Sequence, residues 1–372
     1  MTETAPAHPV ETSRVRLVSL DAYRGLIMLT LLFGAIFHSL KDVPGWHWLY
    51  VQNEHVEWEG CVYWDLIQPS FTFMVGVAMP FALARRRDAG DSWGERFGHV
   101  LLRAFNLILV GILLDHVGAE RIEIGFIRVL QQIGISYVLA FFVAEKSWRV
   151  QALTAAAILI GWTLIWMFNP WNGPGGPWAM GFENIGGAFD RWMFDHGMIG
   201  KSNYPGFYVG LNVIPSTATI LFGVMAGGLI RKGLPHTRTL QILITAGVSA
   251  ILVGLAVSPW LPLIKRIWTP SFAVYAGGWT TLILALFYWI IEVRGVRRWA
   301  FPLIVVGMNS IAAYVIAGCF GNWFKRVTGV WIKGLEEPMG VAWFPVFERV
   351  LFVAFAWCVL YWLWRRRIFF KC

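Results

Sequence analysis

Residues 53–87, NEHVEWEGCVYWDLIQPSFTFMVGVAMPFALARRR, contain the pattern that decides the fold. The part from 63 to 84 is almost entirely apolar, and a helix needs about 20 such residues to cross a hydrocarbon core roughly 30 Å thick. A histidine and several carboxylates gather at one end of this run, and three arginines follow the other end. The stretch therefore predicts a membrane-spanning helix with chemically different ends.

Apolar runs of similar length recur along the whole chain. Hydrophobic residues make up 57% of the sequence, charged residues make up 14%, and there are 22 tryptophans, which is unlike a soluble domain. The runs are continuous rather than alternating, which is typical of membrane helices and not of barrel strands. We predict an all-α polytopic membrane protein with ten spans in one bundle, at about residues 17–40, 63–84, 97–116, 124–144, 149–168, 211–230, 238–257, 270–291, 300–320 and 345–364.

The basic residues are distributed unevenly between the segments that join these spans. Eighteen lie at the chain ends and in every second connection, whereas nine lie in the alternate connections. Cytoplasmic segments of membrane proteins are enriched in Lys and Arg, so both termini are predicted to be cytoplasmic. Residues 53–62 then lie on the outer, periplasmic or luminal, face. Topology also accounts for the net charge of +9, which gives no reason to expect a nucleic-acid partner.

The chain is predicted to form a short cytoplasmic tail (1–16) followed by a single transmembrane domain (17–372). The tail is polar and holds no apolar core, so we expect no cleavable signal peptide. The longest connection, about 169–210, lies outside and is rich in Gly, Pro and Trp. A connection of this length in a compact protein is usually a binding element or a lid.

Polar residues inside membrane spans are candidates for function because their burial is costly. Asp21 and Arg24 lie on one face of the first helix, as a structural ion pair or with Arg24 as a contact to a cytoplasmic phosphate or pantetheine. Arg128 and Gln131 recur at helical spacing in the fourth span, and Asn309 lies inside the ninth. Pairing within the bundle is the alternative interpretation of these three residues.

His55 precedes the second span, and Asp65 falls in its first turn. Histidine titrates near neutral pH and is therefore suited to acid–base chemistry. A carboxylate beside it could orient the ring and stabilise its charged form. The same spacing is compatible with a solvated loop histidine and an aspartate N-cap, so both interpretations stay open from the residues alone.

The cysteines and histidines form no metal-binding pattern, and we expect no metal site. Cys61, Cys319, Cys358 and Cys372 have neither metal-ligand spacing nor a paired framework. No nucleophile elbow, P-loop or dinucleotide-binding glycine pattern is found in the sequence.

Several blocks, taken in order, resemble the heparan-alpha-glucosaminide N-acetyltransferase family of polytopic membrane acyltransferases. RLVSLDAYRG (16–25) is similar to the opening helix of that family. HVEWEG (55–60), followed by DLIQPSF (65–71), resembles its H-x-x-W-x-G…D-L-[VI]-x-P-x-F segment. The later blocks that are similar are VLQQ (129–132), Asp190-Arg191, VGMNSIAAYV (306–315) and WRRRIFFKC (364–372). The resemblance covers about residues 16–372.

The resemblance implies acetyl transfer from cytoplasmic acetyl-CoA to the amino group of a glucosamine on the far side of the membrane. His55 matches the catalytic histidine of the family, and Asp65 would orient it. The resemblance also favours a homodimer and suggests a bacterial inner membrane as the location of the protein. The residues that we expect near acetyl-CoA are Arg24, Arg103, Arg128, Gln131 and Asn309, and those that we expect near the acceptor are Glu57, Trp58, Asp190 and Arg191.

Some positions depart from the family pattern and leave the acceptor open. Ala35 stands where the family often has an asparagine, and Gln132 stands where it has an arginine. A D-P-E-G block before the sixth span is missing, with GFYVGLN (206–212) in its place. Two other functions therefore remain alternatives: a sugar transporter, and an O-acyltransferase that acts on a cell-envelope polysaccharide.

Overall fold

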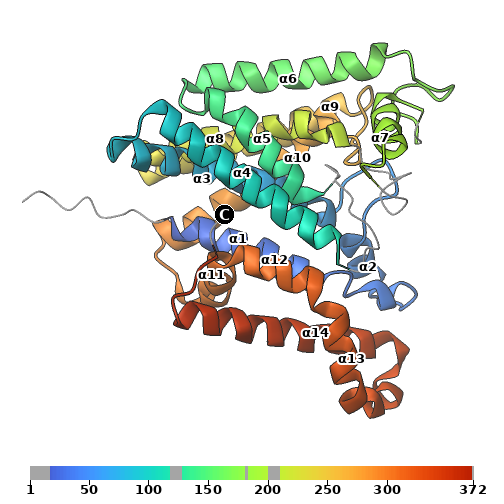
Figure 1. The fold of residues 1–372 in the computed structure, drawn as a ribbon. Coiled ribbons are helices and arrows are strands. Elements are labelled where there is room, and N and C mark those ends of the chain that lie inside the picture. Colours follow the sequence, from blue (N-terminus) through green and yellow to red (C-terminus); the bar gives the residue numbers. More distant parts are fainter. Residues whose placement is uncertain (1–16, 118–127, 181–182, 200–209, 371–372) are drawn as a thin grey trace, which may run out of the picture.

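The computed structural model describes residues 17–117, 128–180, 183–199 and 210–370, so the predicted tail (1–16) lies outside the described residues. The regular elements within these ranges are all helices, and the predicted all-helical class is confirmed. The α-helices labelled in Figure 1 are α1 (Val18–Phe33), α2 (His47–Asn53), α3 (Ile67–Asp88), α4 (Trp93–Asp115), α5 (Val129–Ala144), α6 (Trp148–Phe168), α7 (Ile185–Asp195), α8 (Val213–Arg231), α9 (His236–Val257), α10 (Pro270–Tyr288), α11 (Phe301–Met308), α12 (Ser310–Cys319), α13 (Gly321–Ile332) and α14 (Glu336–Arg365).

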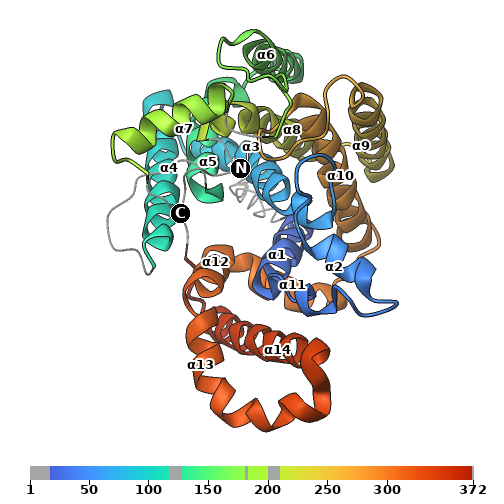
Figure 2. The ribbon, with the colours of Figure 1, turned by 90° about the vertical axis from the view of Figure 1, so that its right-hand side faces the viewer.

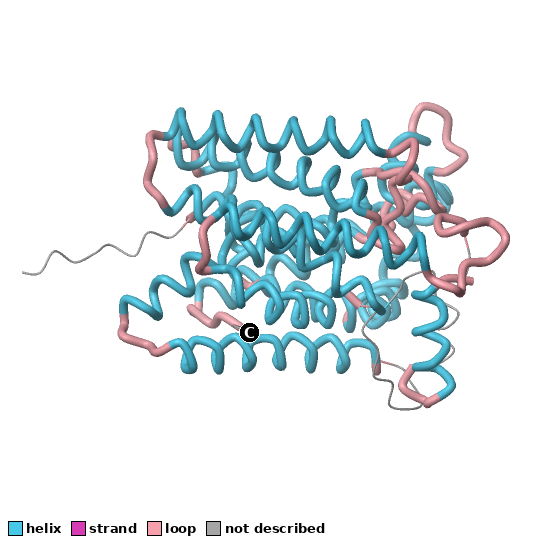
Figure 3. Tube along the Cα trace, turned by 90° about the horizontal axis from the view of Figure 1, so that it is seen from above, coloured by secondary structure: helices cyan, strands magenta, loops and turns pink. Residues whose placement is uncertain are grey.

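The long helices run side by side across one bundle (Figure 3). Within the described ranges, seven helical stretches are long and apolar enough to cross a membrane, or eight if the bent pair α11 and α12 is one span. α1 and α5 have 16 residues each, which corresponds to roughly 24 Å of helix. The multi-pass membrane character is thus confirmed, whereas the number ten and the location of both termini stay predictions.

α3 and α8 pack backbone to backbone at the centre of the bundle, and this contact fixes the helix that follows Asp65. A Cβ atom on Gly76 would lie 2.1 Å from the carbonyl oxygen of Ile220, and one on Gly223 would lie 2.0 Å from that of Phe73. Glycine is therefore required at both positions, because any side chain would push the helices apart. Small residues at such contacts are typical of helix pairs in membranes.

The ninth predicted span is not one straight helix. α11 and α12 are bent by 70° at Asn309, whose backbone leaves the helical region with φ −123° and ψ 43°. The Asn309 amide donates to the carbonyl of Ile368 (3.0 Å) and accepts from the N–H of Phe370 (3.2 Å). The end of the chain therefore folds back against the bend, and Figure 1 shows it entering the bundle.

Two outer segments also differ from the sequence prediction. α1 ends at Phe33 instead of reaching residue 40, because Gly34 adopts a φ of 55° and returns its N–H to the carbonyls of Leu31 and Thr30. The long loop 169–210 contains α7, while residues 181–182 and 200–209 of that loop lie outside the described part of the chain. Figure 2 shows α2 and α7 lying across the ends of the long helices.

Candidate active site

The two ends of the bundle differ in chemistry. The histidine end carries α2, α7 and the loops 54–62, 169–180 and 258–269, on the right of Figure 1. The arginine end carries residues 85–92 after α3 and the start of α4. The histidine end is the face that the basic residues of the sequence predict to be outside.

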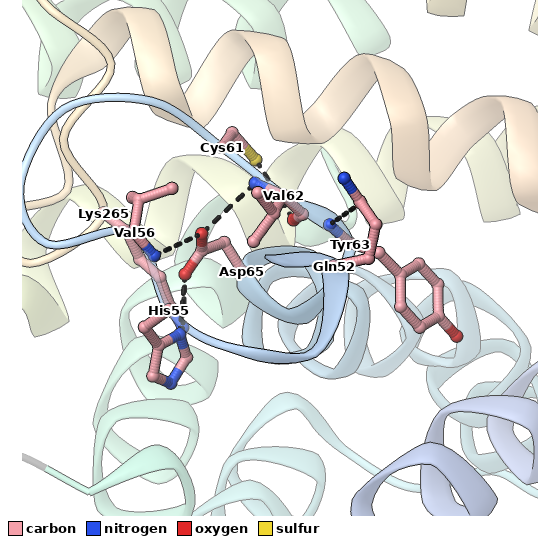
Figure 4. A network of polar contacts seen from close by, with 8 residues as sticks. All are labelled: Gln52, His55, Val56, Cys61, Val62, Tyr63, Asp65 and Lys265. Carbon is pink, nitrogen blue, oxygen red and sulfur yellow. Dashed lines mark hydrogen bonds and ion pairs between the residues drawn. The ribbon is translucent and has the colours of Figure 1, made fainter. Parts of the chain in front are cut away.

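His55 and Asp65 form a close pair at the histidine end (Figure 4). Nδ1 of His55 lies 2.7 Å from Oδ1 of Asp65. The other carboxylate oxygen accepts the N–H of Val62 (3.2 Å) and the N–H of Val56 (3.5 Å). Asp65 thus caps the short helix Tyr63–Leu66 and orients His55 at the same time, so the two interpretations of the sequence do not exclude each other.

The pairing determines which ring nitrogen of His55 carries the proton. A carboxylate can only accept, so Nδ1 carries the hydrogen and Nε2 carries the lone pair in the neutral ring. The His55 side chain is 36% exposed, whereas that of Asp65 is 1% exposed. In Figure 4 the ring extends away from the loop, with Nε2 on the side opposite to Asp65. Acid–base or nucleophilic catalysis requires an accessible nitrogen, here Nε2, on a ring that a buried carboxylate holds in place through the other nitrogen.

Lys265 is a third member of this cluster, and the sequence analysis missed it. It comes from the loop between α9 and α10, and its Nζ lies 3.2 Å from Nδ1 of His55 and 3.5 Å from Oδ1 of Asp65. Burial lowers the pKa of Lys265 to about 8, against the opposing effect of the Asp65 carboxylate. One signal was present: Lys265 and Arg266 are cations in an otherwise apolar loop on the face where cations are disfavoured.

The loop that carries His55 is held by two other loops of the histidine end. The N–H of Gly60 donates to the carbonyl of Leu263 at 2.8 Å. The indole N–H of Trp58 donates to the carbonyl of Trp178 at 2.7 Å. Trp58, which we expect near the substrate that accepts the acetyl group, therefore also anchors the loop. Glu57 is exposed on the same loop. The three loops together fix the position of His55 relative to Lys265.

Asp190 and Arg191 lie on α7 and differ in environment. Asp190 is buried and its Oδ1 accepts the N–H of Gly210 at 3.1 Å. Burial raises the pKa of Asp190 to about 7, and the Gly210 N–H partly offsets this effect. Arg191 is exposed. Asn212, two residues after Gly210, donates to the carbonyl of Arg266 at 2.8 Å, which connects α7 with the loop that carries Lys265.

Arg103 lines a basic cavity of about 620 Å³ at the arginine end. Its guanidinium lies 4.9 Å from the ring centre of Tyr137, and its Nε is buried without a hydrogen-bond partner in the described part of the chain. Among the described residues that line the cavity, Asp91 is the acidic one, and it pairs with Arg86 at 3.2 Å. The other basic lining residues are Arg85, Arg96 and His99. Such a cavity suits phosphate groups.

The other residues that we expected near acetyl-CoA are not gathered at this cavity. Arg128 and Gln131 both contact Asp115 at the end of α4, at 2.9 Å each, and this places them toward the histidine end. Arg24 lies 3.4 Å from Asp21 within α1. Asn309 holds the C-terminal segment at the bend between α11 and α12. These four residues lie at three locations, and Arg103 at the cavity is at a fourth.

The fold and the site define a polytopic helical membrane protein with a histidine–aspartate–lysine cluster at one end of its bundle. The family model described as the heparan-alpha-glucosaminide N-acetyltransferase catalytic domain matches residues 16–259, and the chain belongs to this family. The match includes His55, Asp65 and Asp190, and Lys265 lies beyond its end.

Two curated relatives are similar over most of this chain. The human heparan-alpha-glucosaminide N-acetyltransferase is 24% identical over 367 aligned positions, and the alignment covers 83% of this chain and 54% of the relative. The mouse protein of the same name is 24% identical over 376 aligned positions, and the alignment covers 84% of this chain and 55% of the relative. The chain therefore spans about half the length of the curated relatives that it matches.

Proposed function

We propose that the protein is an acetyltransferase that moves acetyl from acetyl-CoA to an amino sugar or glycan across the membrane. The observation that carries this proposal is the 2.7 Å contact between His55 and the buried Asp65 in a chain of this family. The pair supplies a base or nucleophile with a fixed tautomer, which amine attack on a thioester requires.

The acyl donor is proposed to enter from the arginine end. The basic cavity around Arg103 offers guanidinium groups to the phosphates of acetyl-CoA, and the pantetheine arm would extend between the helices toward His55. From Arg103 to Asp115, α4 advances by 12 residues, or roughly 18 Å, toward the histidine end. The cavity therefore lies part of the way into the bundle, which shortens the distance that the arm has to cross.

Two routes use the same groups. In the first, Nε2 of His55 takes the proton of the acceptor amine as the amine attacks the thioester; the carbon–sulfur bond breaks, and the leaving CoA thiolate takes up that proton from His55. In the second, Nε2 attacks the thioester carbonyl, the carbon–sulfur bond breaks, and the acetyl group passes from the ring to the amine. Acetyl trapped on the protein by acetyl-CoA alone supports the second route, whereas turnover only through a ternary complex of protein, acetyl-CoA and acceptor supports the first.

The donor and acceptor are tested by incubating the purified protein with radiolabelled acetyl-CoA and separate acceptors: glucosamine, envelope glycans and muropeptides. We expect the radiolabelled acetyl group on the amino group of an acceptor. Label on a hydroxyl group would indicate an O-acyltransferase of an envelope polysaccharide. Absence of label on every acceptor, with the protein folded and in a bilayer, would contradict the proposal.

A sugar transporter is the second candidate function, because broken helices such as α11 and α12 are common in transporters. In this protein, however, the Asn309 amide at the break is bound to the C-terminal segment. The two functions are separated by uptake of a labelled amino sugar into protein-containing vesicles without acetyl-CoA. Accumulation in those vesicles would favour transport.

A further inference from the structure

Lys265 brings a positive charge into a buried site that already contains a negative one. The side chains of Lys265 and Asp65 are 5% and 1% exposed, and isolated charges at such positions are very costly. The two charges compensate each other, but the same carboxylate also binds His55 at 2.7 Å. The charge state of the ring therefore depends on both neighbours.

A carboxylate alone would favour the wrong form of His55 for the proposed chemistry. An opposite charge in contact with imidazole stabilises the imidazolium, which has no lone pair on either nitrogen. Both routes of acetyl transfer begin with a lone pair on Nε2. A second group that disfavours the imidazolium is thus useful at this site.

Lys265 is placed to have this effect. Its Nζ lies 3.2 Å from Nδ1 of His55, and a like charge at this distance opposes protonation of the ring. Burial raises the pKa of the nearby Cys61 thiol to about 12, so that it stays neutral. Among the described residues of the loops 54–62 and 258–269, the other charged groups are Arg266, next to Lys265; Glu54, which contacts His38 at 2.8 Å; and the exposed Glu57 and Glu59.

We propose that Lys265 is a positioning residue that holds His55 neutral, with its proton on Nδ1 and its lone pair on Nε2. This inference rests on the proposed acetyl transfer and names a residue that the sequence motifs do not contain. Asp65 fixes the orientation of the ring, and Lys265 balances the charge of Asp65.

The same arrangement promotes the second half of the covalent route. When Nε2 bonds to the acetyl carbon, the carbon–sulfur bond breaks, the CoA thiolate leaves and the ring becomes positively charged. The ammonium of Lys265 then destabilises the acetylated ring. As the amine bonds to the acetyl carbon, Nε2 leaves with the electron pair of its bond, and the proton of the amine ends on the CoA thiolate through solvent.

The test measures the protonation of His55 without turnover. The rate of carbethoxylation of His55 by diethylpyrocarbonate, followed by peptide mass spectrometry between pH 5 and 9 without acetyl-CoA, reports the neutral ring. Lys265→Met should move the midpoint of this profile upward by about one to three pH units. Lys265→Arg should return it toward the wild-type position, because the charge is restored. An unchanged or lower midpoint in Lys265→Met would overturn the inference.

Asp65→Asn provides a second measurement if Lys265→Met does not fold. It removes the negative charge and should move the midpoint in the opposite direction, to lower pH, and an upward shift would contradict the inference. Because the assay needs no acetyl transfer, it stays informative if the proposed function fails. In an active enzyme, the acid limb of kcat/KM should move with the midpoint in Lys265→Met, and a fixed limb would separate the charge effect from catalysis.

Discussion

Removal of either charge from the Asp65–Lys265 pair should destabilise the protein, and removal of both should cost less than the two single losses added together. Asp65→Asn leaves the ammonium of Lys265 buried at 5% exposure, and Lys265→Met leaves the carboxylate of Asp65 buried at 1% exposure. Breaking one half of a buried pair costs about 3–5 kcal/mol, because the remaining charge is uncompensated. Each single variant should therefore lose about 3–5 kcal/mol of unfolding free energy.

The double variant Asp65→Asn/Lys265→Met contains neither charge and therefore avoids part of this penalty. We expect its loss to be smaller than the sum of the two single losses by about 2–3 kcal/mol, which is at the upper end of coupling energies between contacting residues. The assay is an unfolding titration with SDS in mixed micelles, followed by tryptophan fluorescence, on all four proteins at pH 7.

The matched control is a cycle on an exposed ion pair. Lys325 and Glu348 lie 3.2 Å apart, but the lysine side chain is 69% exposed, so their coupling should stay below about 1 kcal/mol. Additive losses in the Asp65–Lys265 cycle would refute the claim that these charges compensate each other inside the protein.

Three further predictions concern the surrounding structure. Burial raises the pKa of Asp190 from 3.8 to about 7, so the unfolded chain ionises at lower pH than the folded protein. The free energy of unfolding should therefore fall by up to about 4 kcal/mol as pH rises from 4 to 7. Asp190→Asn should remove this loss in thermal melts at pH 8 and leave stability at pH 4 nearly unchanged. Gly223→Val should abolish folded protein in size-exclusion chromatography, since its Cβ would lie 2.0 Å from the carbonyl of Phe73, whereas Gly228→Ala meets no atom within 4 Å and should fold. Arg103→Gln should raise the KM for acetyl-CoA about tenfold through the loss of one charge-assisted contact, with kcat little changed.

The helices were predictable because the membrane imposes a simple rule on the sequence. A span must be apolar for about 20 residues, and most predicted ranges lie within a few residues of the observed helices. The rule does not predict a break in a helix when the polar groups at the break are paired by a distant part of the chain. The bend at Asn309 depends on Ile368 and Phe370, about 60 residues later, and no local pattern encodes that contact.

The candidate site was predictable to the extent that it is local. His55 and Asp65 are ten residues apart, and their family motif contains both. Lys265 is 210 residues from His55, and the order of loops along the chain does not reveal which of them meet. The five residues that we expected near acetyl-CoA were selected because they are polar residues within spans. A polar side chain in a bundle can instead pair with another side chain of the protein, as Arg128 does with Asp115.

The role of His55 is tested most directly by acetyl transfer from radiolabelled acetyl-CoA to glucosamine by purified wild-type protein, His55→Ala and His47→Ala. His47 is a second histidine of the histidine end, bonded through Nδ1 to the carbonyl of Lys41 at 2.7 Å, and serves as the matched control. We predict that His55→Ala loses about 10²–10⁴-fold of the rate, the usual contribution of a positioned base, and that His47→Ala retains it. Full activity in folded His55→Ala would contradict the assignment of His55 as the residue that carries the reaction.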